Sequence, residues 1–233
     1  GYPLTADVNG YRQVGVATFD RNINRGRRWS AARAYLHPVM NRPNLHVRTL
    51  AMTTRILFEG TRAVGVEYTQ LGATHTVRAG EVVLCGGAIN TPQLLQLSGV
   101  GNADELKALG ITPVADVKGV GEHLQDHLEV YIQYASKQPV SIAPGLKYHN
   151  RPKLAADWLF FRKGLGATNH FEGGGFVRSN DDVDYPNLMF HFLPLAIRYD
   201  GSSPIKGHGY QVHIGPMYSD ARGTCKIRSA DPS

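Results

Sequence analysis

The sequence predicts an α/β domain followed by an α+β domain that is built on an antiparallel sheet with a helix on one face. A short apolar run that leads into a double glycine and a helical pattern predicts the first domain. Alternating apolar residues from Glu129 onwards predict the second. The glycine-rich residues 119–127 separate the two patterns, so we place the domains at 1–127 and 128–233.

The segment from Glu81 to Gly101 organises the first domain. Its apolar residues 82–85 predict a central parallel strand that is buried on both faces. The glycines at 86–87 allow a tight turn or a close approach of another group to the backbone. Thr91 fits the N-cap and Pro92 the first position of the helix that follows. An ordinary strand-to-helix corner is the alternative to a ligand-binding turn.

The remaining elements follow from periodicity and from turn and capping residues. Residues 1–20 carry turn signals and are expected to form a loop. Ser30 can cap a helix that ends near residue 40, and Asn102 can cap one that ends at residue 110. The predicted strands of the first domain are 45–50, 55–58, 63–68 and 74–78, the middle two forming a hairpin. Those of the second domain are 130–135, 171–178, 187–193, 210–216 and 224–228, with a helix at 152–162.

Composition indicates a globular protein without a disulfide framework. Hydrophobic residues make up 42% of the chain, mean hydropathy is -0.26, and no apolar run approaches the roughly 18 residues of a spanning helix. Cys85 and Cys225 are expected to be buried free thiols in a reducing compartment. The net charge of +6 includes an arginine cluster within residues 21–28. We interpret this cluster as a solvated loop, with no nucleic-acid partner, because no nucleic-acid-binding motif accompanies it.

A long motif follows the predicted strand. It reads Gly87-Ala88-x-x-Thr91-Pro92-x-Leu94-Leu95-x-x-Ser98-Gly99-Val100-Gly101 and resembles the second signature of the glucose–methanol–choline (GMC) flavin oxidoreductases. The similarity extends through nearly the whole chain and is closest to the choline-oxidising members of that family. The stretches that carry it are GYPLTADVNGY, RPNLHVRT, RAVGVEY, GVGEHLQDHLE, NHFEGGGFVRS and YPNLMFHFLP.

The resemblance implies an FAD cofactor and a central fragment of a longer enzyme. Residues 1–127 would be part of a Rossmann-like FAD-binding domain, and residues 128–233 most of the substrate-binding domain. The GxGxxG fingerprint that holds the FAD phosphates is absent from the sequence, and in the family it lies upstream. The catalytic histidine and its Asn or His partner lie downstream. We therefore assign no catalytic residue and expect these 233 residues alone to be inactive.

Four residues are the cofactor-binding candidates that the resemblance implies. Thr53 falls at a family position whose backbone contacts the flavin adenine, and Gly86, Gly87 and Ala88 form a turn beside the adenosine part of the cofactor. The alternatives are an ordinary strand residue at position 53 and a turn that only packs the helix onto the sheet.

Three residues are the substrate-binding candidates: Phe171, Glu172 and His191. The matching histidine of choline-oxidising relatives hydrogen-bonds the alcohol oxygen, which a neutral imidazole can do. Aromatic faces such as that of Phe171 suit a quaternary ammonium, which has no hydrogen to donate. The alternatives are a half-buried sheet histidine at 191 and, slightly preferred, a structural glutamate at 172.

His123 and His127 stand at positions i and i+4, a spacing that metal ligands share. The surrounding glycines favour a loop over a helix, and we expect no metal site. The family has a similar loop at the flavin edge of the substrate domain, usually with Asn at the position of His123.

The expected reaction of the parent enzyme is FAD-dependent oxidation of choline to betaine aldehyde, on the route to glycine betaine, by hydride transfer to the flavin. The sequence does not specify the electron acceptor. The expected location is the cytoplasm, with peripheral association with the inner membrane as an alternative. Two other functions stay open: oxidation of another primary alcohol by the same kind of enzyme, and a non-catalytic binding module.

Overall fold

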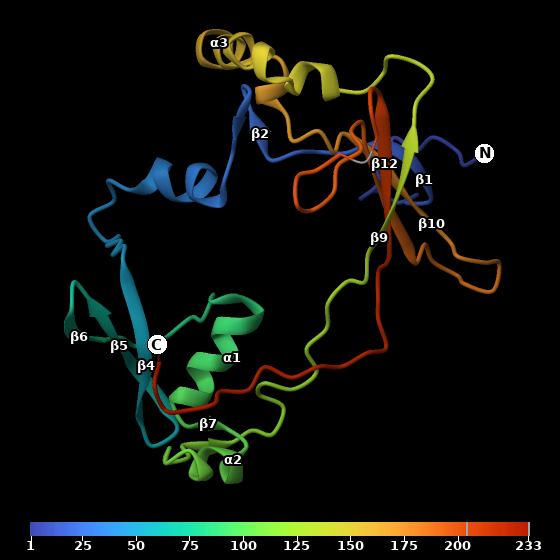
Figure 1. Ribbon diagram of the computed structural model, residues 1–233. Helices are drawn as coiled ribbons and strands as arrows, with labels where there is room; N and C mark the ends of the chain where they lie inside the picture. Colours follow the sequence, from blue (N-terminus) through green and yellow to red (C-terminus); the bar gives the residue numbers. More distant parts are fainter. Residues whose placement is uncertain (204, 233) are drawn as a thin grey trace. The chain divides into compact units, whose positions relative to one another are not determined.

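The computed structural model describes residues 1–203 and 205–232 and divides the chain into two compact units (Figure 1). Unit 1 comprises Gly1–Leu45 and His127–Ser219, and unit 2 comprises His46–Asp126 and Asp220–Ser233. The chain passes from unit 2 to unit 1 between Asp126 and His127, beside the boundary that the sequence suggests. Each unit is assembled from two separate segments of the chain.

A five-stranded antiparallel sheet forms the centre of unit 1, as the alternation after Glu129 predicts. Its strand order is β1-β10-β11-β12-β9. The strands are β1 (Gly15–Thr18), β9 (Val130–Ala135), β10 (Gly173–Val177), β11 (Leu188–Leu193) and β12 (Gly209–Pro216). The predicted loop over residues 1–20 is wrong at β1, whose four residues pair with β10, a strand distant in sequence.

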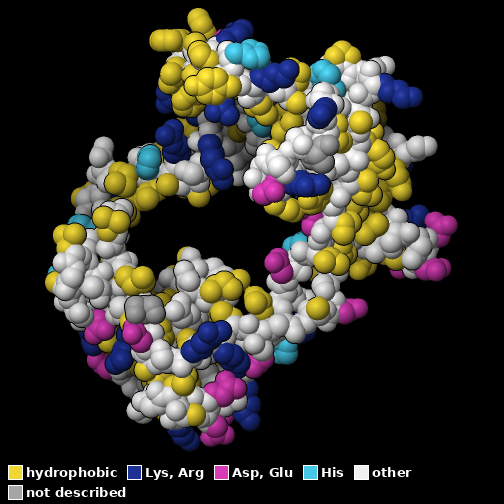
Figure 2. Space-filling model, viewed as in Figure 1, with side chains coloured by type: hydrophobic (Ala, Val, Ile, Leu, Met, Phe, Trp, Pro, Cys, Tyr) yellow, Lys and Arg dark blue, Asp and Glu magenta, His cyan; other side chains and the backbone are white. Residues whose placement is uncertain are grey.

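The two faces of this sheet differ in the polarity and the burial of their side chains. One face, which we call the site face, carries the buried side chains of Phe176, Gln211 and His213. The opposite face, the apolar face, carries hydrophobic side chains from three strands, and Figure 2 shows such side chains gathered over β9 and β12. Its exposed members are Val130, Ile132, Tyr134 and Phe192. The polar groups of the sheet are thus more buried than many of its apolar ones.

Two glycines in β10 allow other parts of unit 1 to approach the strand closely. A Cβ added to Gly174 would lie 2.6 Å from the ring of Phe19. A Cβ added to Gly175 would lie 2.1 Å from the carbonyl oxygen of Gly15 in β1. Since Phe19 and β1 occupy the space of these missing side chains, no larger residue fits without a backbone shift.

We expect Gly175→Ala to lower the free energy of unfolding by about 1–3 kcal/mol, because the added methyl group would force β1 away from β10. Gly173→Ala is the matched control, since its Cβ would lie 3.7 Å from its nearest neighbour, the carbonyl oxygen of Ala17. Denaturant unfolding of the two variants measures the difference. Equal stability of both variants would contradict the close approach.

The helical segments of unit 1 lie outside the sheet core. α3 (Arg151–Phe161) matches the predicted helix, but it packs on the short turns η3 (Ala143–Leu146), η4 (Tyr148–Asn150) and η5 (Leu165–Ala167) rather than on a sheet face. Its Trp158 donates a hydrogen bond of 2.8 Å to the carbonyl of Gly26, in the small hairpin β2 (Ile23–Asn24)–β3 (Arg27–Arg28).

The helix predicted from Ser30 to residue 40 is wrong in type. It consists of a π-helical turn, η1 (Ala32–Leu36), followed by a 3-10 turn, η2 (His37–Val39). Pro38 has no backbone N–H to continue an α-helical ladder, which accounts for the change of geometry there.

Unit 2 is a three-stranded antiparallel sheet that packs against one helix. The strands are β4 (Ala51–Glu59), β5 (Arg62–Gln70) and β6 (Ala73–Arg78), and the helix is α1 (Gly87–Leu97), beside β4 in Figure 1. The buried Ser98 links them, because its hydroxyl accepts from the N–H of Ile56 (2.9 Å) and donates to the carbonyl of Leu94 (2.6 Å). The predicted hairpin and the strand at 74–78 are confirmed, whereas 45–50 is not a strand.

The predicted central strand at 82–85 is wrong. The segment has no regular secondary structure, no strand among the described residues pairs with it, and Val83 is 75% exposed. An apolar run is typical of a buried strand, but a strand also requires a neighbouring strand to form hydrogen bonds with it. The following helix begins at Gly87 rather than at Thr91, so Pro92 lies inside α1.

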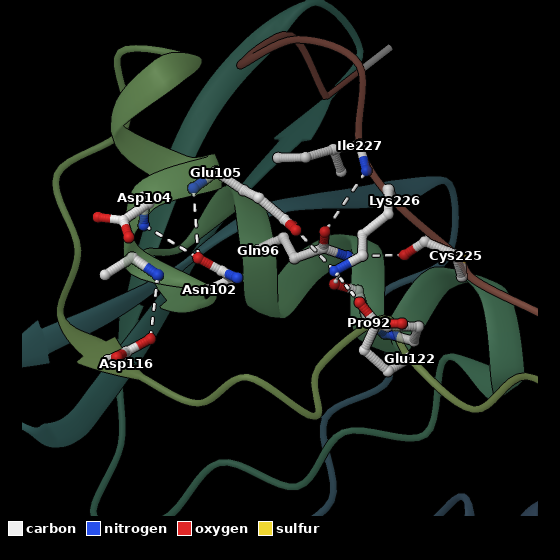
Figure 3. A network of polar contacts seen from close by, with 11 residues as sticks. Pro92, Gln96, Asn102, Asp104, Glu105, Asp116, Glu122, Cys225, Lys226 and Ile227 are labelled. Carbon is white, nitrogen blue, oxygen red and sulfur yellow. Dashed lines mark hydrogen bonds and ion pairs between the residues drawn. The ribbon is translucent and has the colours of Figure 1, made fainter.

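The last segment of the chain joins unit 2 through a polar network around α1 and α2 (Ala103–Ala108) (Figure 3). The buried amide of Gln96 donates to the carbonyl of Cys225 at 2.9 Å. Lys226 lies between two carboxylates, 2.8 Å from Glu105 and 2.6 Å from Glu122, and these hydrogen bonds raise the pKa of Lys226. The prediction that residues 224–228 form a strand of the other unit is therefore wrong. They form an irregular segment that belongs to unit 2.

Asn102 caps α2 as predicted, because its side-chain oxygen accepts from the backbone N–H of Asp104 (3.1 Å) and Glu105 (3.4 Å). A short parallel pair, β7 (Val100–Gly101) and β8 (Ala115–Asp116), flanks this helix.

Candidate functional site

The register of the unit 1 sheet places a row of residues side by side on the site face. Going across the strands, Ala17 lies opposite Gly174, Gly174 opposite His191, His191 opposite His213, and His213 opposite Tyr131. Residues that are directly opposite in an antiparallel pair share one face and have their Cβ atoms within about 5.5 Å. Two histidines and a tyrosine thus lie together on β11, β12 and β9.

His191 lies between two aromatic rings and is half-buried. The ring of Phe19 meets it edge-on with centroids 5.5 Å apart, and that of Phe171 does so at 6.1 Å. Burial lowers the pKa of His191 below its ordinary value, which Glu129 partly opposes and His213 reinforces. The imidazole is therefore neutral at neutral pH and able to donate or accept a hydrogen bond.

Glu129, the residue before β9, receives two hydrogen bonds. Nδ1 of His213 lies 2.8 Å from its Oε1, and the hydroxyl of Tyr199 donates to the same oxygen at 2.7 Å. The bond with His213, followed by that from Tyr199, lowers the pKa of Glu129, although burial opposes this. The glutamate is thus a carboxylate at neutral pH. Among the described residues no hydrogen-bond donor reaches its Oε2.

A buried amide determines which nitrogen of His213 carries the hydrogen. The side-chain oxygen of Gln211 accepts from the backbone N–H of Ile197 and from the amide of Gln133, both at 2.9 Å. Because a backbone N–H can only donate, the NH₂ group of Gln211 must face the other way, toward Nε2 of His213 at 2.6 Å. Nε2 therefore accepts, and Nδ1 holds the hydrogen that points to Glu129.

Aromatic rings surround the carboxylate and the two histidines. The ring of Tyr131 stacks on His213 at 5.5 Å and meets Tyr199 edge-on at 5.2 Å. Phe171 contacts His213 edge-on at 5.6 Å as well as His191. With Phe19 beside His191, the site thus combines one negative charge, two imidazoles and four aromatic side chains within unit 1.

The structure brings together two of the three predicted substrate-binding residues, Phe171 and His191. Glu172 points elsewhere and forms an ion pair with Arg21 and a hydrogen bond with Thr168. This agrees with the structural alternative for Glu172. Most of the other aromatic residues of this unit lie away from the cluster: Tyr134, Phe190 and Phe192 on the apolar face, Trp158 at the β2–β3 hairpin, and Phe160 and Phe161 exposed.

Sequence reasoning missed Glu129, His213, Tyr199 and Gln211. The alternation in β12, with Gln211 and His213 two residues apart among apolar neighbours, was the available signal for two of them. It shows that polar side chains share one face of the strand. Glu129 and Tyr199 lie outside the strands, so periodicity does not place them.

The predicted cofactor residues lie in unit 2, where two of them line one cavity. Thr53 and Gly86 border a hollow of about 760 Å³ that is lined by residues of β4, β5 and β6, by residues 81–86 and by α1. Gly87 has φ of +81°, as a tight turn requires, and does not border this hollow, and Ala88 borders a smaller one of about 240 Å³. The larger cavity is mainly apolar and can admit a group of the size of a nucleoside.

No part of the described chain forms a group of three or more metal-ligating side chains. His123 has φ of +60° in an irregular segment, so the helical spacing of His123 and His127 does not apply. Within residues 1–203 and 205–232, the helices are too short or too polar to cross a membrane. Both cysteines are free thiols, but Cys85 is exposed rather than buried as predicted.

Comparison with known sequences identifies the family. Residues 1–129 match the GMC oxidoreductase family, and the chain belongs to it. It is 59% identical over 232 residues to the oxygen-dependent choline dehydrogenases of Staphylococcus saprophyticus and Staphylococcus aureus. The match covers 100% of this chain and 41% of each relative, so the chain spans less than half the length of these proteins.

Solved structures share the fold. The crystal structure of pyridoxine 4-oxidase from Mesorbium loti is similar with a TM-score of 0.79 and 26% identity, over 99% of this chain and 42% of the other. A formate oxidase structure has a TM-score of 0.89 at 22% identity, over 99% of this chain and 45% of the other. The fold is thus the mixed α/β fold with antiparallel sheets of GMC oxidoreductases.

The lowered pKa of His191 leads to a prediction about stability. Below about pH 6.5 the unfolded chain binds a proton at this histidine more readily than the folded protein does. The free energy of unfolding should therefore decrease as the pH is lowered. His191→Gln removes this effect and should show a shallower decline between about pH 6.5 and 5. Denaturant unfolding across that range measures it, and parallel profiles would contradict the burial of this imidazole.

Proposed function

We propose that this chain is the central part of an FAD-dependent enzyme that oxidises choline to betaine aldehyde by hydride transfer to the flavin. The observation that supports the proposal is the site face, where a carboxylate flanked by tyrosines lies close to a neutral histidine. The sequence similarity to choline dehydrogenases agrees with it. The proposed substrate-binding residues lie in unit 1, and the proposed cofactor contacts lie in unit 2.

Glu129 is the proposed partner of the quaternary ammonium group. A trimethylammonium group has no hydrogen to donate and binds through diffuse charge, which carboxylates and aromatic faces supply. Both hydrogen bonds to Glu129 end on Oε1, which leaves Oε2 to face a cation. Tyr131 and Tyr199 flank the carboxylate and can cover the methyl groups.

His191 is the proposed partner of the choline hydroxyl. It is neutral, half-buried and on the same face as the carboxylate, one strand away from His213. A neutral imidazole can hold the hydroxyl oxygen by a hydrogen bond while the cationic end is bound elsewhere, which orients the carbon that loses the hydride. Phe19 and Phe171 limit the access of water to this imidazole.

The proposed cofactor contacts are Thr53, Gly86, Gly87 and Ala88, in a partial Rossmann-like domain. The hollow beside Thr53 and Gly86 is large enough for the adenosine part of FAD, and a glycine turn permits close approach of its backbone. When bound, the flavin would accept the hydride. The free thiols Cys85 and Cys225 support a reducing compartment, the cytoplasm, as the location.

The proposed function is tested by comparing substrates in the full-length enzyme. Choline and its neutral isostere 3,3-dimethylbutan-1-ol differ only in charge. Anaerobic flavin reduction should be far more efficient with choline, mainly through substrate affinity. Equal efficiency with the neutral alcohol, or a preference for aryl alcohols, would favour the second candidate, a GMC enzyme for another alcohol.

Replacing the carboxylate should remove the preference for a cation. We expect Glu129→Gln to raise the KM for choline about 10- to 100-fold, because the amide keeps the shape and loses the charge. The KM for 3,3-dimethylbutan-1-ol should stay within about threefold of the wild-type value. A similar loss for both alcohols would show that Glu129 supports the fold rather than the cation.

Replacing the histidine should affect the reductive step. We expect His191→Ala to lower the rate constant of flavin reduction by choline about 10- to 1000-fold with the flavin still bound, as single hydrogen-bond losses do elsewhere. Phe192→Leu, the next residue on β11 but on the apolar face, is the control. Anaerobic stopped-flow measurements and a thermal melt check this. Unchanged reduction with a lowered melting temperature would leave His191 a structural residue.

A further inference from the structure

We propose that His213 is a positioning residue that holds the carboxylate of Glu129 in the orientation required to bind the cationic group of the substrate. The inference rests on the proposed function and extends it to a residue that does not itself face the ligand. His213 is 7% exposed, whereas the side chain of Glu129 is 39% exposed. The histidine thus lies beneath the carboxylate, on the side away from solvent.

The ring of His213 is fixed by its neighbours. Tyr131 stacks on it with an interplanar angle of 28°, and Phe171 meets it edge-on at 74°. These contacts restrict rotation of the imidazole about its side-chain bonds. They hold Nδ1 toward Glu129 and Nε2 toward Gln211, so both ring nitrogens have assigned partners.

Gln211 makes this orientation the only one that satisfies every group. It is 3% exposed and bound through its oxygen to Ile197 and Gln133. The other tautomer of the imidazole would place an N–H against the NH₂ of Gln211 and leave Oε1 of Glu129 facing a ring nitrogen without hydrogen. A ring turned over by 180° would present carbon atoms to both partners. Either arrangement leaves polar groups unpaired, which is costly. The glutamine chain thus determines the direction of the N–H.

The other groups around His213 do not replace its role. The charged or titratable neighbours are Glu129, His191, Tyr131 and Tyr199. Of these, only Tyr199 also donates to Glu129, and its side chain belongs to a residue that is 79% exposed. Without His213, the carboxylate of Glu129 would keep only the hydrogen bond from the exposed Tyr199 and could turn away from the cation. Affinity for the cation should fall, while the chemistry at the alcohol carbon should not change.

The experiment compares three variants of the full-length enzyme. His213→Leu removes the donor and keeps much of the volume, and His213→Asn keeps an N–H near the position of Nδ1. Val212→Ala is the control, because Val212 is on the same strand and the opposite face. The measurements are KM and kcat for choline, the KM for 3,3-dimethylbutan-1-ol, and inhibition by tetramethylammonium.

We expect His213→Leu to raise the KM for choline and the inhibition constant of tetramethylammonium about 10-fold, with kcat within about threefold of wild type. His213→Asn should restore both values to within about threefold, and Val212→Ala should change neither. The KM for the neutral alcohol should be the same in all four proteins. This pattern would support the positioning role, because a general packing defect would raise both KM values and Asn would not rescue it.

Three results would overturn the inference. If His213→Leu leaves the choline KM unchanged while wild type prefers choline, Glu129 needs no positioning, and the proposed function stands. If wild type neither prefers choline nor binds tetramethylammonium, the proposed function fails and the inference with it. If His213→Leu loses its flavin and His213→Asn does not, the shift in melting temperature caused by tetramethylammonium replaces the kinetic measurement. A shift in His213→Leu as large as that in wild type also contradicts the proposal.

Discussion

The register between β11 and β12 is the constraint on which the candidate site depends. It places His191 opposite His213, and the pairing of β12 with β9 places His213 opposite Tyr131. Because side chains alternate between faces, a slip of one residue would turn a strand's contribution to the other side of the sheet. At the edge of the sheet, the glycines of β10 allow β1 and Phe19 to approach closely, and β1 pairs with β10 in a defined register.

The site face shows how a sheet can bury polar groups at little cost. Gln211 and His213 are buried, and each hydrogen-bonding atom described for them has a partner. A satisfied network of this kind is rigid, since moving one member leaves others unpaired. Rigidity is useful in a binding site, where ordering a charged side chain in advance reduces the free energy lost on binding. The network is thus suited to hold a carboxylate still.

Sequence reasoning predicted local structure well where the determining residues are close together in the chain. The β4–β5 hairpin, the cap at Asn102 and the strand Val130–Ala135 all follow from neighbouring residues. It failed where the structure depends on distant segments. β1 needs β10, residues 224–228 need Gln96 and Gly121, and the apolar run at 82–85 has no described strand to pair with.

The same division applies to the candidate site. A motif places His191 and Phe171, because the family resemblance covers the stretches that contain them. Glu129 is brought to the site by contacts with His213 and Tyr199, which lie 84 and 70 residues further along the chain. Neither the spacing of residues in the sequence nor the periodicity of a strand predicts such a long-range contact. Sequence reasoning therefore identified the site residues that lie in stretches shared with the family, and it missed Glu129 and Tyr199, which long-range contacts bring to the sheet.

The two-segment construction of unit 1 has a consequence for biosynthesis. β1 pairs with the strand β10, and about 160 residues separate them. Ribosomes add about 5–20 residues per second, so β1 emerges roughly 8–30 seconds before its partner has been synthesised. During that interval the intervening unit 2 segment His46–Asp126 can already form its local hairpins. The first segment must meanwhile remain open and accessible to chaperones, so the order of folding differs from the order of synthesis.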